Sequence, residues 1–317
     1  MGKLKHAIAR IYRNSDFGYY AVRPLYKLYE LALKNVSDEY IIKKKFKEFM
    51  GYELDLDNPV TLNEKINWLK LYDRTDLHTQ AADKFRVRDY IKEVIGEEYL
   101  VPLLYQNDDP EALIPENFPD IPFIIKCNHD SSGGVIVKDK ATVDWKKIQK
   151  RFKKLLKENY FNSSREWQYK NIKPTVIGET LLTDKNGKIP FDYKIHCLNG
   201  KVRMIQVDID RNSDKHYRNW YNANWEREPY KWSSKKGKGK FTDPSDYDIE
   251  KPATFDKMVA LSEKLAKAFI YVRVDWYDVD GKLYFGELTF HHDGGNRPIE
   301  PTEWDTKLGN ELVLPKK

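Results

Sequence analysis

Apolar and polar residues alternate most regularly in the segment 270–296, on both sides of an Asp280-Gly281 pair. This alternation is typical of two half-buried strands, and Asp-Gly is typical of the tight turn between them. We expect a three-residue loop, Val279 to Gly281, in which the glycine adopts a left-handed conformation. That register pairs Arg273 with Glu287. Because side chains alternate, five polar residues then share one face: Arg273, Asp275, Glu287, Thr289 and His291.

Two carboxylates on this face, Asp275 and Glu287, would repel each other on neighbouring strands unless a cation lay between them. A Mg²⁺ ion suits the position, because it takes oxygen ligands and is usually held by one or two carboxylates and by substrate phosphates. A ligand-free ladder of ion pairs with Arg273 explains the same charges, and a two-residue loop would place the carboxylates on opposite faces. The hairpin alone therefore leaves a magnesium site and an ion-pair ladder open.

The first 110 residues carry mainly helical periodicity. Proline is favoured in the first helical turn, so we expect a helix from Pro24 to Asn35, followed by another from Ser37 to Gly51. Thr61 and Glu64 have the spacing of a capping box, which predicts a helix that ends near Tyr72. A further helix is expected over residues 80–95.

Strands predominate after residue 111, and we also expect two amphipathic helices, over 144–160 and 254–269. Asn199-Gly200 is a strong hairpin signal between two of the strands. This mixture of helices and strands predicts an α+β fold. The expected strands cover 122–128, 135–138, 175–182, 191–198 and 201–208.

Composition limits the class of protein. Of 317 residues, 40% are hydrophobic and 33% charged, which is typical of a folded, soluble chain. We find no apolar run of membrane-spanning length and no signal-peptide pattern. The two cysteines, Cys127 and Cys197, exclude a disulfide framework and fit a cytoplasmic protein.

The net charge of +6 favours anionic partners, such as nucleotide phosphates, anionic glycans or acidic lipids. No recognised nucleic-acid-binding motif is present, so we expect no nucleic-acid partner. Two basic segments, 1–13 and Lys235–Lys240, are compatible with peripheral contact at the inner face of a membrane or with an ordinary solvated surface, which is the commoner outcome for a stretch such as 1–13.

Candidate phosphate-binding chemistry lies in the first predicted hairpin. Lys126 stands inside an apolar strand, where a lysine needs an anion, and the small residues Ser131 to Gly134 follow it. Nothing bulky at such a tip keeps backbone N–H groups from phosphate oxygens. On later strands, Glu179 is a single charge in an apolar run, and Asp192 and Lys194 share one face.

Taken in order, these parts resemble the ATP-grasp superfamily and, within it, the TupA-like ATP-grasp family of bacterial cell-surface polysaccharide genes. The resemblance covers residues 55–300. It is carried by Leu62-Asn63-Glu64-Lys65, Ala82 to Arg88, Ile95 to Pro102, Lys126 to His129 with Gly133-Gly134, Asp192-Tyr193-Lys194, and Asn199 to Val202.

The resemblance implies an ATP-grasp fold, in which two α+β subdomains clasp ATP, preceded by a mainly helical N-terminal region. We expect the helical region over residues 1–110. The small subdomain with the phosphate hairpin would cover 111–180, and the large subdomain with the Mg/ATP hairpin 181–317.

It also implies site residues. The Mg²⁺ ligands would be Asp275, Glu287 and Thr289, and the catalytic residues Arg273, Lys194 and His291. The superfamily usually has Glu-x-Asn where this chain has Glu287-Leu288-Thr289, which weakens the case for a second metal position. The nucleotide contacts would be Lys84, Lys126, Ser131, Ser132, Gly133, Gly134, Glu179, Leu181, Asp192 and Lys194.

The implied activity is that of an ATP- and Mg²⁺-dependent carboxylate–amine ligase. It would form an amide on a bacterial surface polysaccharide (capsule, O-antigen or teichuronic type) or on its precursor. Its partners would be ATP, a glycan or lipid-linked glycan, and an amino acid or amine. A glycan kinase and a glycosyltransferase remain alternatives. A binding protein without turnover is disfavoured, because Lys126, Asp275 and Glu287 are all present.

Overall fold

The computed structural model describes residues 16–131, 134–211, 216–234 and 241–316. The chain divides into two compact units, Met1–Lys44 and Lys45–Lys317. In the first unit, helix α2 covers Asp16–Lys34, and α3 (Asp38–Met50) begins there and ends in the second unit. The expectation that Pro24 opens a helix is wrong. The helix starts earlier and includes Pro24 in its interior.

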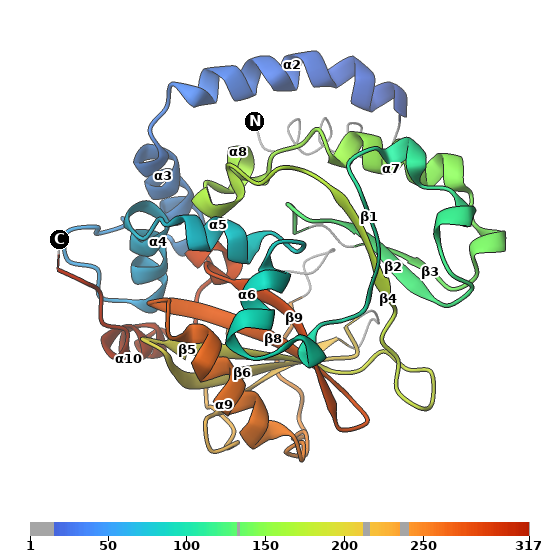
Figure 1. The fold of residues 1–317 in the computed structure, drawn as a ribbon. Helices are drawn as coiled ribbons and strands as arrows, with labels where there is room; N and C mark the ends of the chain where they lie inside the picture. The colour runs from blue at the N-terminus through green and yellow to red at the C-terminus, as the bar shows by residue number, and fades with distance from the viewer. Residues whose placement is uncertain (1–15, 132–133, 212–215, 235–240, 317) are drawn as a thin grey trace. The chain divides into compact units, whose positions relative to one another are not determined.

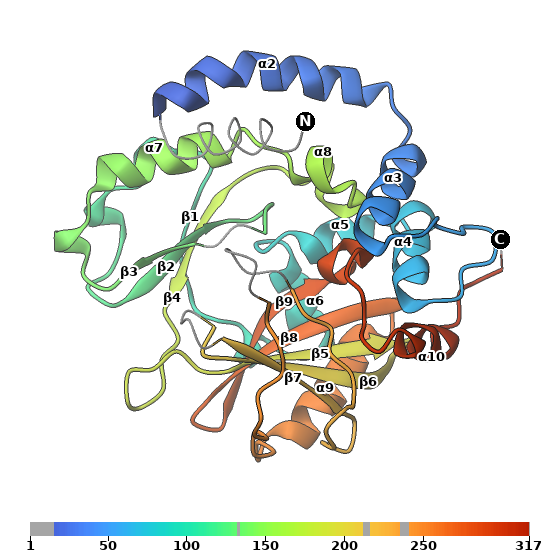
Figure 2. The same ribbon diagram turned by 180° about the vertical axis from the view of Figure 1, so that it is seen from behind.

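A four-stranded antiparallel sheet has the order β1-β4-β2-β3, with β1 at Leu103–Asn107, β4 at Val176–Thr180, β2 at Phe123–Cys127 and β3 at Val135–Val137. Helix α7 (Trp145–Leu155) lies along it (Figures 1 and 2). Phe123, Ile125 and Cys127 pack with the apolar side of α7. Because strand side chains alternate, Lys126 points to the face away from that core.

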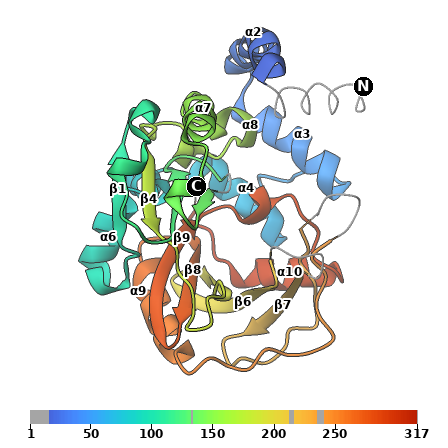
Figure 3. The ribbon, with the colours of Figure 1, turned by 90° about the vertical axis from the view of Figure 1, so that its right-hand side faces the viewer.

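A five-stranded antiparallel sheet has the order β7-β6-β5-β8-β9. Helix α9 (Phe255–Ala266) packs against one face (Figures 1 and 3). On β5, Tyr193, Ile195 and Cys197 join the core under α9, so Asp192, Lys194 and His196 lie on the other face. The strands cover Tyr217–Asn222 (β7), Lys201–Ile209 (β6), Asp192–Leu198 (β5), Tyr271–Val279 (β8) and Lys282–Thr289 (β9).

The hairpin of β8 and β9 has a two-residue turn, so the expected three-residue loop is wrong. Val279 pairs with Lys282, and both turn residues, Asp280 and Gly281, adopt positive φ angles of 51° and 87°. Type I′ turns need this conformation, and they match the twist of a two-residue hairpin.

A β-bulge nevertheless brings the two carboxylates to one face. Trp276 pairs with Phe285 and Val274 with Leu288, so Asp275 alone opposes both Gly286 and Glu287. The extra residue on β9 shifts the register by one. Arg273 consequently pairs with Thr289, where we had expected Glu287. The shared face of Arg273, Asp275, Glu287 and Thr289 was therefore predicted correctly, from the wrong register.

The remaining helices fill the space beside the sheets. They are α4 (Leu62–Tyr72), α5 (Asp76–Ala82), α6 (Val87–Val94), α8 (Tyr160–Ser164) and α10 (Glu303–Glu311). The capping box of Thr61 and Glu64 is confirmed. Single turns of 3₁₀ helix cover Glu97–Tyr99, Pro110–Ala112, Pro115–Asn117, Lys140–Thr142 and Trp167–Tyr169. The segment His292–Gly295 forms a turn in which Asp293 and Gly294 are left-handed.

The expected helix over residues 80–95 is wrong, because the chain breaks between α5 and α6. The carboxylate of Asp83 accepts hydrogen bonds from the backbone N–H groups of Phe85 and Arg86, at 2.9 and 3.2 Å. A short polar side chain competes with the helix for backbone donors in this way. The break positions Lys84 beside the phosphate hairpin, where its N–H donates to the carbonyl of Asn128 at 3.0 Å.

Helix α10 packs directly on the start of α4. The Nζ of Lys65 donates to the carbonyl oxygens of Gly309 and Leu312, at 2.7 and 2.8 Å. The approach is so close that a Cβ atom on Gly309 would lie 2.1 Å from the carbonyl oxygen of Val60. In the described part of the chain, no helix is long and apolar enough to cross a bilayer.

We expect Gly309→Ala to destabilise the fold by about 1–3 kcal/mol or more, because backbone atoms must move to admit the methyl group. Urea unfolding of the purified variant measures this loss. Asn310→Ala, at the exposed next position of the same helix, is the matched control and should stay within about 0.5 kcal/mol of wild type. Equal losses in the two variants would show that the contact of α10 with α4 is not tight.

Candidate active site

The polar face of the five-stranded sheet lines a cavity of about 610 Å³. Six of the residues predicted from sequence line it: Ser131, Lys194, Arg273, Glu287, Thr289 and His291. Further polar residues on its wall include Asp208, Arg211, His216, Arg218, Ser234, His292 and Asp293. Strands β5 to β9 contribute six of these thirteen groups, and the segments that precede or follow the strands contribute the others.

Asp275 lies at the centre of a buried charge cluster. Its carboxylate is 2% exposed and accepts two hydrogen bonds from Arg273, from Nε at 2.6 Å and from Nη2 at 2.7 Å. The Nζ of Lys194 donates to Asp275 Oδ2 at 2.8 Å and also contacts the carboxylate of Asp192. Bidentate, charge-assisted contacts of this kind offset the cost of burying an ionised group.

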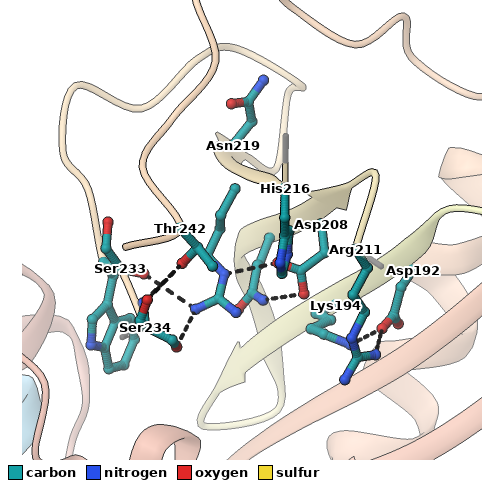
Figure 4. A network of polar contacts seen from close by, with 12 residues as sticks. Asp192, Lys194, Asp208, Arg211, His216, Asn219, Ser233, Ser234 and Thr242 are labelled. Carbon is teal, nitrogen blue, oxygen red and sulfur yellow. Dashed lines mark hydrogen bonds and ion pairs between the residues drawn. The ribbon is translucent and has the colours of Figure 1, made fainter. Parts of the chain in front are cut away.

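Asp192 has a second cationic partner from another strand end. Arg211 Nη1 donates to Asp192 Oδ2 at 2.7 Å, and Figure 4 shows Lys194 and Arg211 converging on this carboxylate. Asp192 was predicted to contact the nucleotide. In the structure it orients Lys194, which itself reaches the cavity.

Glu287 is the more open carboxylate of the hairpin, with a side chain that is 43% exposed. It accepts a hydrogen bond from Arg273 Nη2 at 3.1 Å and a longer one from the hydroxyl of Thr289 at 3.4 Å. Burial alone would raise its pKa. The nearby positive charges of Lys84, Arg273, Lys194 and Arg211 outweigh that effect and lower the pKa to about 2.

The carboxylates of Asp275 and Glu287 are the ligand type that suits a divalent cation. Each places an oxygen within 3.1 Å of the same positive group, the Nη2 of Arg273, so the guanidinium now holds the position between them. Carboxylate oxygens are the ligands that Mg²⁺ prefers. Thr289 lies on the same face and adds a hydroxyl oxygen next to Glu287.

The residues predicted to hold the nucleotide base and inner phosphates lie on the smaller sheet. Lys126 Nζ and Glu179 Oε2 form an ion pair at 2.5 Å, and Arg88 approaches the other oxygen of Glu179 at 3.6 Å. Among the described residues, neither Lys126 nor Glu179 lines the cavity. Leu181 directly follows the end of β4, and its N–H donates to the carbonyl of Pro122 at 3.1 Å.

The predicted phosphate hairpin is described only in part, because Ser132 and Gly133 lie outside the described residues. Ser131 lines the cavity. A Cβ atom on Gly134 would lie 2.6 Å from the carbonyl oxygen of Ile125, so only glycine fits against that strand. Lys84 donates to the backbone carbonyl of Asp130 at the base of the hairpin. It thus links the hairpin to the helical part of the chain.

His291 is buried in the wall of the cavity. Its Nδ1 lies 3.2 Å from Gln168 Nε2 and 3.7 Å from a carboxylate oxygen of Glu166. Burial lowers its pKa, and Glu166 opposes that shift in part. A neutral imidazole with these neighbours suits the positioning of a substrate, the role predicted from the sequence.

The sequence analysis missed the acidic and basic groups that β6 and β7 contribute. Asp208 Oδ1 accepts from Arg218 Nε at 2.9 Å and lies 3.2 Å from His216 Nε2, as Figure 4 shows for His216. Gln206 Nε2 donates to the other oxygen at 2.9 Å. The signal was present, because Gln206 and Asp208 alternate along β6 and pair with Lys194 and Asp192 of β5.

The response of the fold to acid tests whether these cations hold Glu287. Its pKa is lowered from 4.5 to about 2, so ionised Glu287 stabilises the fold above pH 4.5. That contribution is lost as the pH falls from 4.5 toward 2. We expect the unfolding free energy of wild type to decline more steeply than that of Glu287→Gln between about pH 5 and pH 3, in urea titrations.

The control for this experiment is Glu116→Gln, a change at an exposed glutamate of the smaller sheet region. It should follow wild type at every pH. Parallel curves for wild type and Glu287→Gln would contradict the assigned ion pairing.

No curated protein matches the sequence. Matching solved structures include D-alanine–D-alanine ligases from Bacillus anthracis (15% identity, TM-score 0.37, 67% of this chain and 57% of that chain) and Helicobacter pylori (12%, 0.40, 81% and 68%). An ADP complex of purK, N5-carboxyaminoimidazole ribonucleotide synthetase, also matches (13%, 0.40, 76% and 52%).

The chain spans 57% of the first of these ligases, and likenesses at such TM-scores assign no activity. A family model described as TupA-like ATPgrasp, in contrast, matches residues 64–313, well over half of the chain. The protein therefore belongs to the TupA-like ATP-grasp family, and its α+β fold is that of the ATP-grasp superfamily.

Proposed function

We propose that this protein is an ATP- and Mg²⁺-dependent ligase that joins a carboxylate to an amine on a bacterial surface polysaccharide or its precursor. The observation that carries the proposal is the charged face of hairpin β8–β9. There Lys194, Arg273 and Glu287 line the cavity, and the buried carboxylate of Asp275 pairs with Lys194 and Arg273 behind them. Membership of the TupA-like ATP-grasp family supports ATP as the energy source.

In the first step, a carboxylate oxygen of the substrate attacks the γ-phosphorus of ATP. A P–O bond forms to the substrate, the P–O bond to ADP breaks, and an acyl phosphate and ADP result. Phosphoryl transfer depends mainly on positioning and on offsetting negative charge. Arg273 and Lys194 supply fixed positive charge at the cavity, and Asp275 fixes the orientation of both.

In the second step, the amine nitrogen attacks the carbonyl carbon of the acyl phosphate. A C–N bond forms, the C–O bond to phosphate breaks, and inorganic phosphate and a proton leave. Asp275 and Glu287, with Thr289, would hold Mg²⁺, which when bound neutralises phosphate charge and orients the triphosphate. Lys126 and the Ser131–Gly134 hairpin would contact the nucleotide phosphates, and Glu179 with Leu181 the adenine.

Nucleotide binding is the first test. Because a ligand that binds only the folded state adds RT ln(1 + [L]/Kd), saturating Mg-ATP should stabilise wild type by about 2.7 kcal/mol at 100 times Kd. Lys126→Ala should weaken Mg-ATP binding in calorimetry. Lys126→Arg should restore it only in part, since a planar guanidinium differs from a compact ammonium.

A matched control for Lys126→Ala is Lys140→Ala. Both side chains are about equally buried, 20% and 22% exposed, and Lys140 pairs with Asp120 and with the carbonyl of Phe118. The control should bind Mg-ATP like wild type. Equal ATP affinity in Lys126→Ala and wild type would remove the role assigned to Lys126, and absent Mg-ATP binding in wild type would refute the proposed function.

Turnover tests the hairpin. Glu287→Gln keeps the shape of the side chain and leaves Arg273 paired with Asp275, so the fold should survive. ADP release should fall at least about 100-fold, because the variant lacks a ligand and a charge at the reacting phosphate. A coupled ADP assay with melting curves measures both quantities. Undiminished turnover would support the ligand-free ion-pair ladder instead, because loss of the ionised carboxylate lowers apo stability in either case.

Product analysis separates the activities. A ligase releases ADP and inorganic phosphate in equal amounts, a glycan kinase releases ADP and a phosphorylated glycan, and a glycosyltransferase consumes a nucleotide sugar.

A further inference from the structure

A second set of polar groups lines the cavity and has no part in the phosphoryl transfer described above. It consists of Arg218 on β7, Ser234, and the adjacent residues His292 and Asp293. Two of its side chains are more than nine-tenths buried, and each keeps a hydrogen-bond donor that meets no acceptor in the described part of the chain, so a ligand in the cavity can satisfy these donors.

Arg218 is the cationic member, with a side chain that is 8% exposed. Its Nε donates to Asp208 at 2.9 Å, and its Nη1 donates to the hydroxyl of Ser234 at 2.7 Å. In the described part of the chain, Nη2 donates to no acceptor. Asp208 and Ser234 hold the guanidinium in place, and two N–H groups remain for a ligand in the cavity.

His292 adds a third unused donor and is 1% exposed. Its Nδ1 lies 2.9 Å from Arg273 Nη1, and a guanidinium can only donate, so Nδ1 is the acceptor. In a neutral imidazole the proton then resides on Nε2. Burial, together with Arg273 and Arg218, holds the pKa of His292 well below its ordinary value, which keeps the ring neutral. Among the described residues, Nε2 has no hydrogen-bond partner.

Asp293 contributes an acceptor beside these donors. One of its oxygens, Oδ2, accepts from Ser234 Oγ at 2.6 Å and lies 3.9 Å from Arg218 Nη1 and 3.8 Å from His292 Nε2, too far for direct hydrogen bonds. Its Oδ1 meets no donor within the described ranges. The residue has a φ of 46°, an uncommon conformation for a non-glycine residue.

Helix α4 fixes the turn that carries Asp293. Lys70 Nζ donates to the carbonyl of Gly294 at 2.6 Å, and Asn67 Nδ2 donates to that of Gly295 at 2.7 Å. A Cβ atom on Gly295 would lie 2.6 Å from Asn67 Nδ2, so the turn is pressed against the helix. The strained backbone of Asp293 is therefore held in place by buried polar contacts, as is common where a side chain must face a ligand.

We propose that Arg218, His292 and Asp293 form the subsite for the amine substrate and that this substrate is an α-amino acid. Its carboxylate would accept from Arg218 Nη2 and His292 Nε2, and its ammonium group would donate to Asp293 Oδ1. The proposal rests on the proposed ligase function, whose second substrate it specifies. A plain carboxylate would be repelled by Asp293 and a plain amine by Arg218, whereas an α-amino acid carries both charges within a few ångströms.

Direct binding tests the subsite without turnover. The full chain, saturated with Mg-ADP, is titrated calorimetrically with glycine, each of the standard L-amino acids, D-alanine and D-glutamate. Propionate and ethylamine serve as analogues of alanine that lack the amine or the carboxylate. We expect at least one amino acid to bind 10-fold or more tighter than either analogue. Binding of no amino acid by a chain that binds Mg-ADP, or analogues that bind as tightly as the amino acid, would overturn the proposal.

Two variants separate the two charges. Asp293→Asn removes the negative charge that pairs with the ammonium group and that repels a plain carboxylate. It should therefore weaken amino-acid binding at least 10-fold and strengthen the binding of propionate. Arg218→Lys shortens the cation and loses the free Nη2, so it should weaken amino-acid binding by a similar factor and leave ethylamine unchanged. A merely structural role predicts no such opposite changes. If Arg218→Lys fails to fold, Asp293→Asn, at a residue that is 26% exposed, decides the question.

The matched control is Arg227→Lys, an arginine that follows β7. Its Nη2 donates to Asn219 Oδ1 and to the carbonyl of Ser245, both at 2.9 Å, and it does not line this cavity. It should bind amino acids like wild type. Mg-ATP affinity is measured for every variant, which separates the two proposals. A wild-type protein that does not bind Mg-ATP refutes the ligase, whereas the amino-acid titrations test the subsite.

Discussion

The site depends on one electrostatic arrangement, the pairing of the buried carboxylate of Asp275 with two cations on neighbouring positions of the sheet. Arg273 contacts both of its oxygens, and Lys194 donates to one of them from strand β5. An unpaired charge in such a place would cost several kcal/mol, so each of the three groups keeps the others in the sheet. Their alternation with apolar residues allows the same strands to pack against α9 on one face and to line the cavity with the other.

The polar side of α4 holds another part of the site, the segment that follows β9. Asn63, Asn67 and Lys70 follow helical spacing and are almost completely buried. They donate to the carbonyl oxygens of Arg297, Gly295 and Gly294, at 3.0, 2.7 and 2.6 Å. The polar residues of Leu62-Asn63-Glu64-Lys65, a segment that contributed to the family resemblance, thus have structural roles. Their side chains cap α4, hold α10 and donate to the carbonyl of Arg297.

Much of the fold followed from local patterns. The α+β class, the five strands predicted after residue 111 and the capping box of α4 are confirmed, and the family model confirms the ATP-grasp relationship. The predicted division at residues 110 and 180, and the roles of the site residues, remain predictions. Strand faces were predictable because alternation is local. The break at Asp83 was not, since its capping hydrogen bonds compete with an otherwise helical pattern. Arg218 was missed because its neighbours come from separate segments of the chain.

The bulge at Gly286 and the turn at Asp280-Gly281 together determine which side chains of the hairpin reach the cavity. One extra residue, in the turn or in the bulge, shifts the pairing of β9 with β8 by one position. The side chains of β9 beyond that point then lie on the opposite face of the sheet, and a second extra residue returns them to the original face. Only the sum matters, so a two-residue turn with a bulge presents the same face as a three-residue turn without one. Related chains are thus free to differ in turn length, provided that the bulge is gained or lost with it. An engineered change in one alone would exchange the charged face for the apolar face.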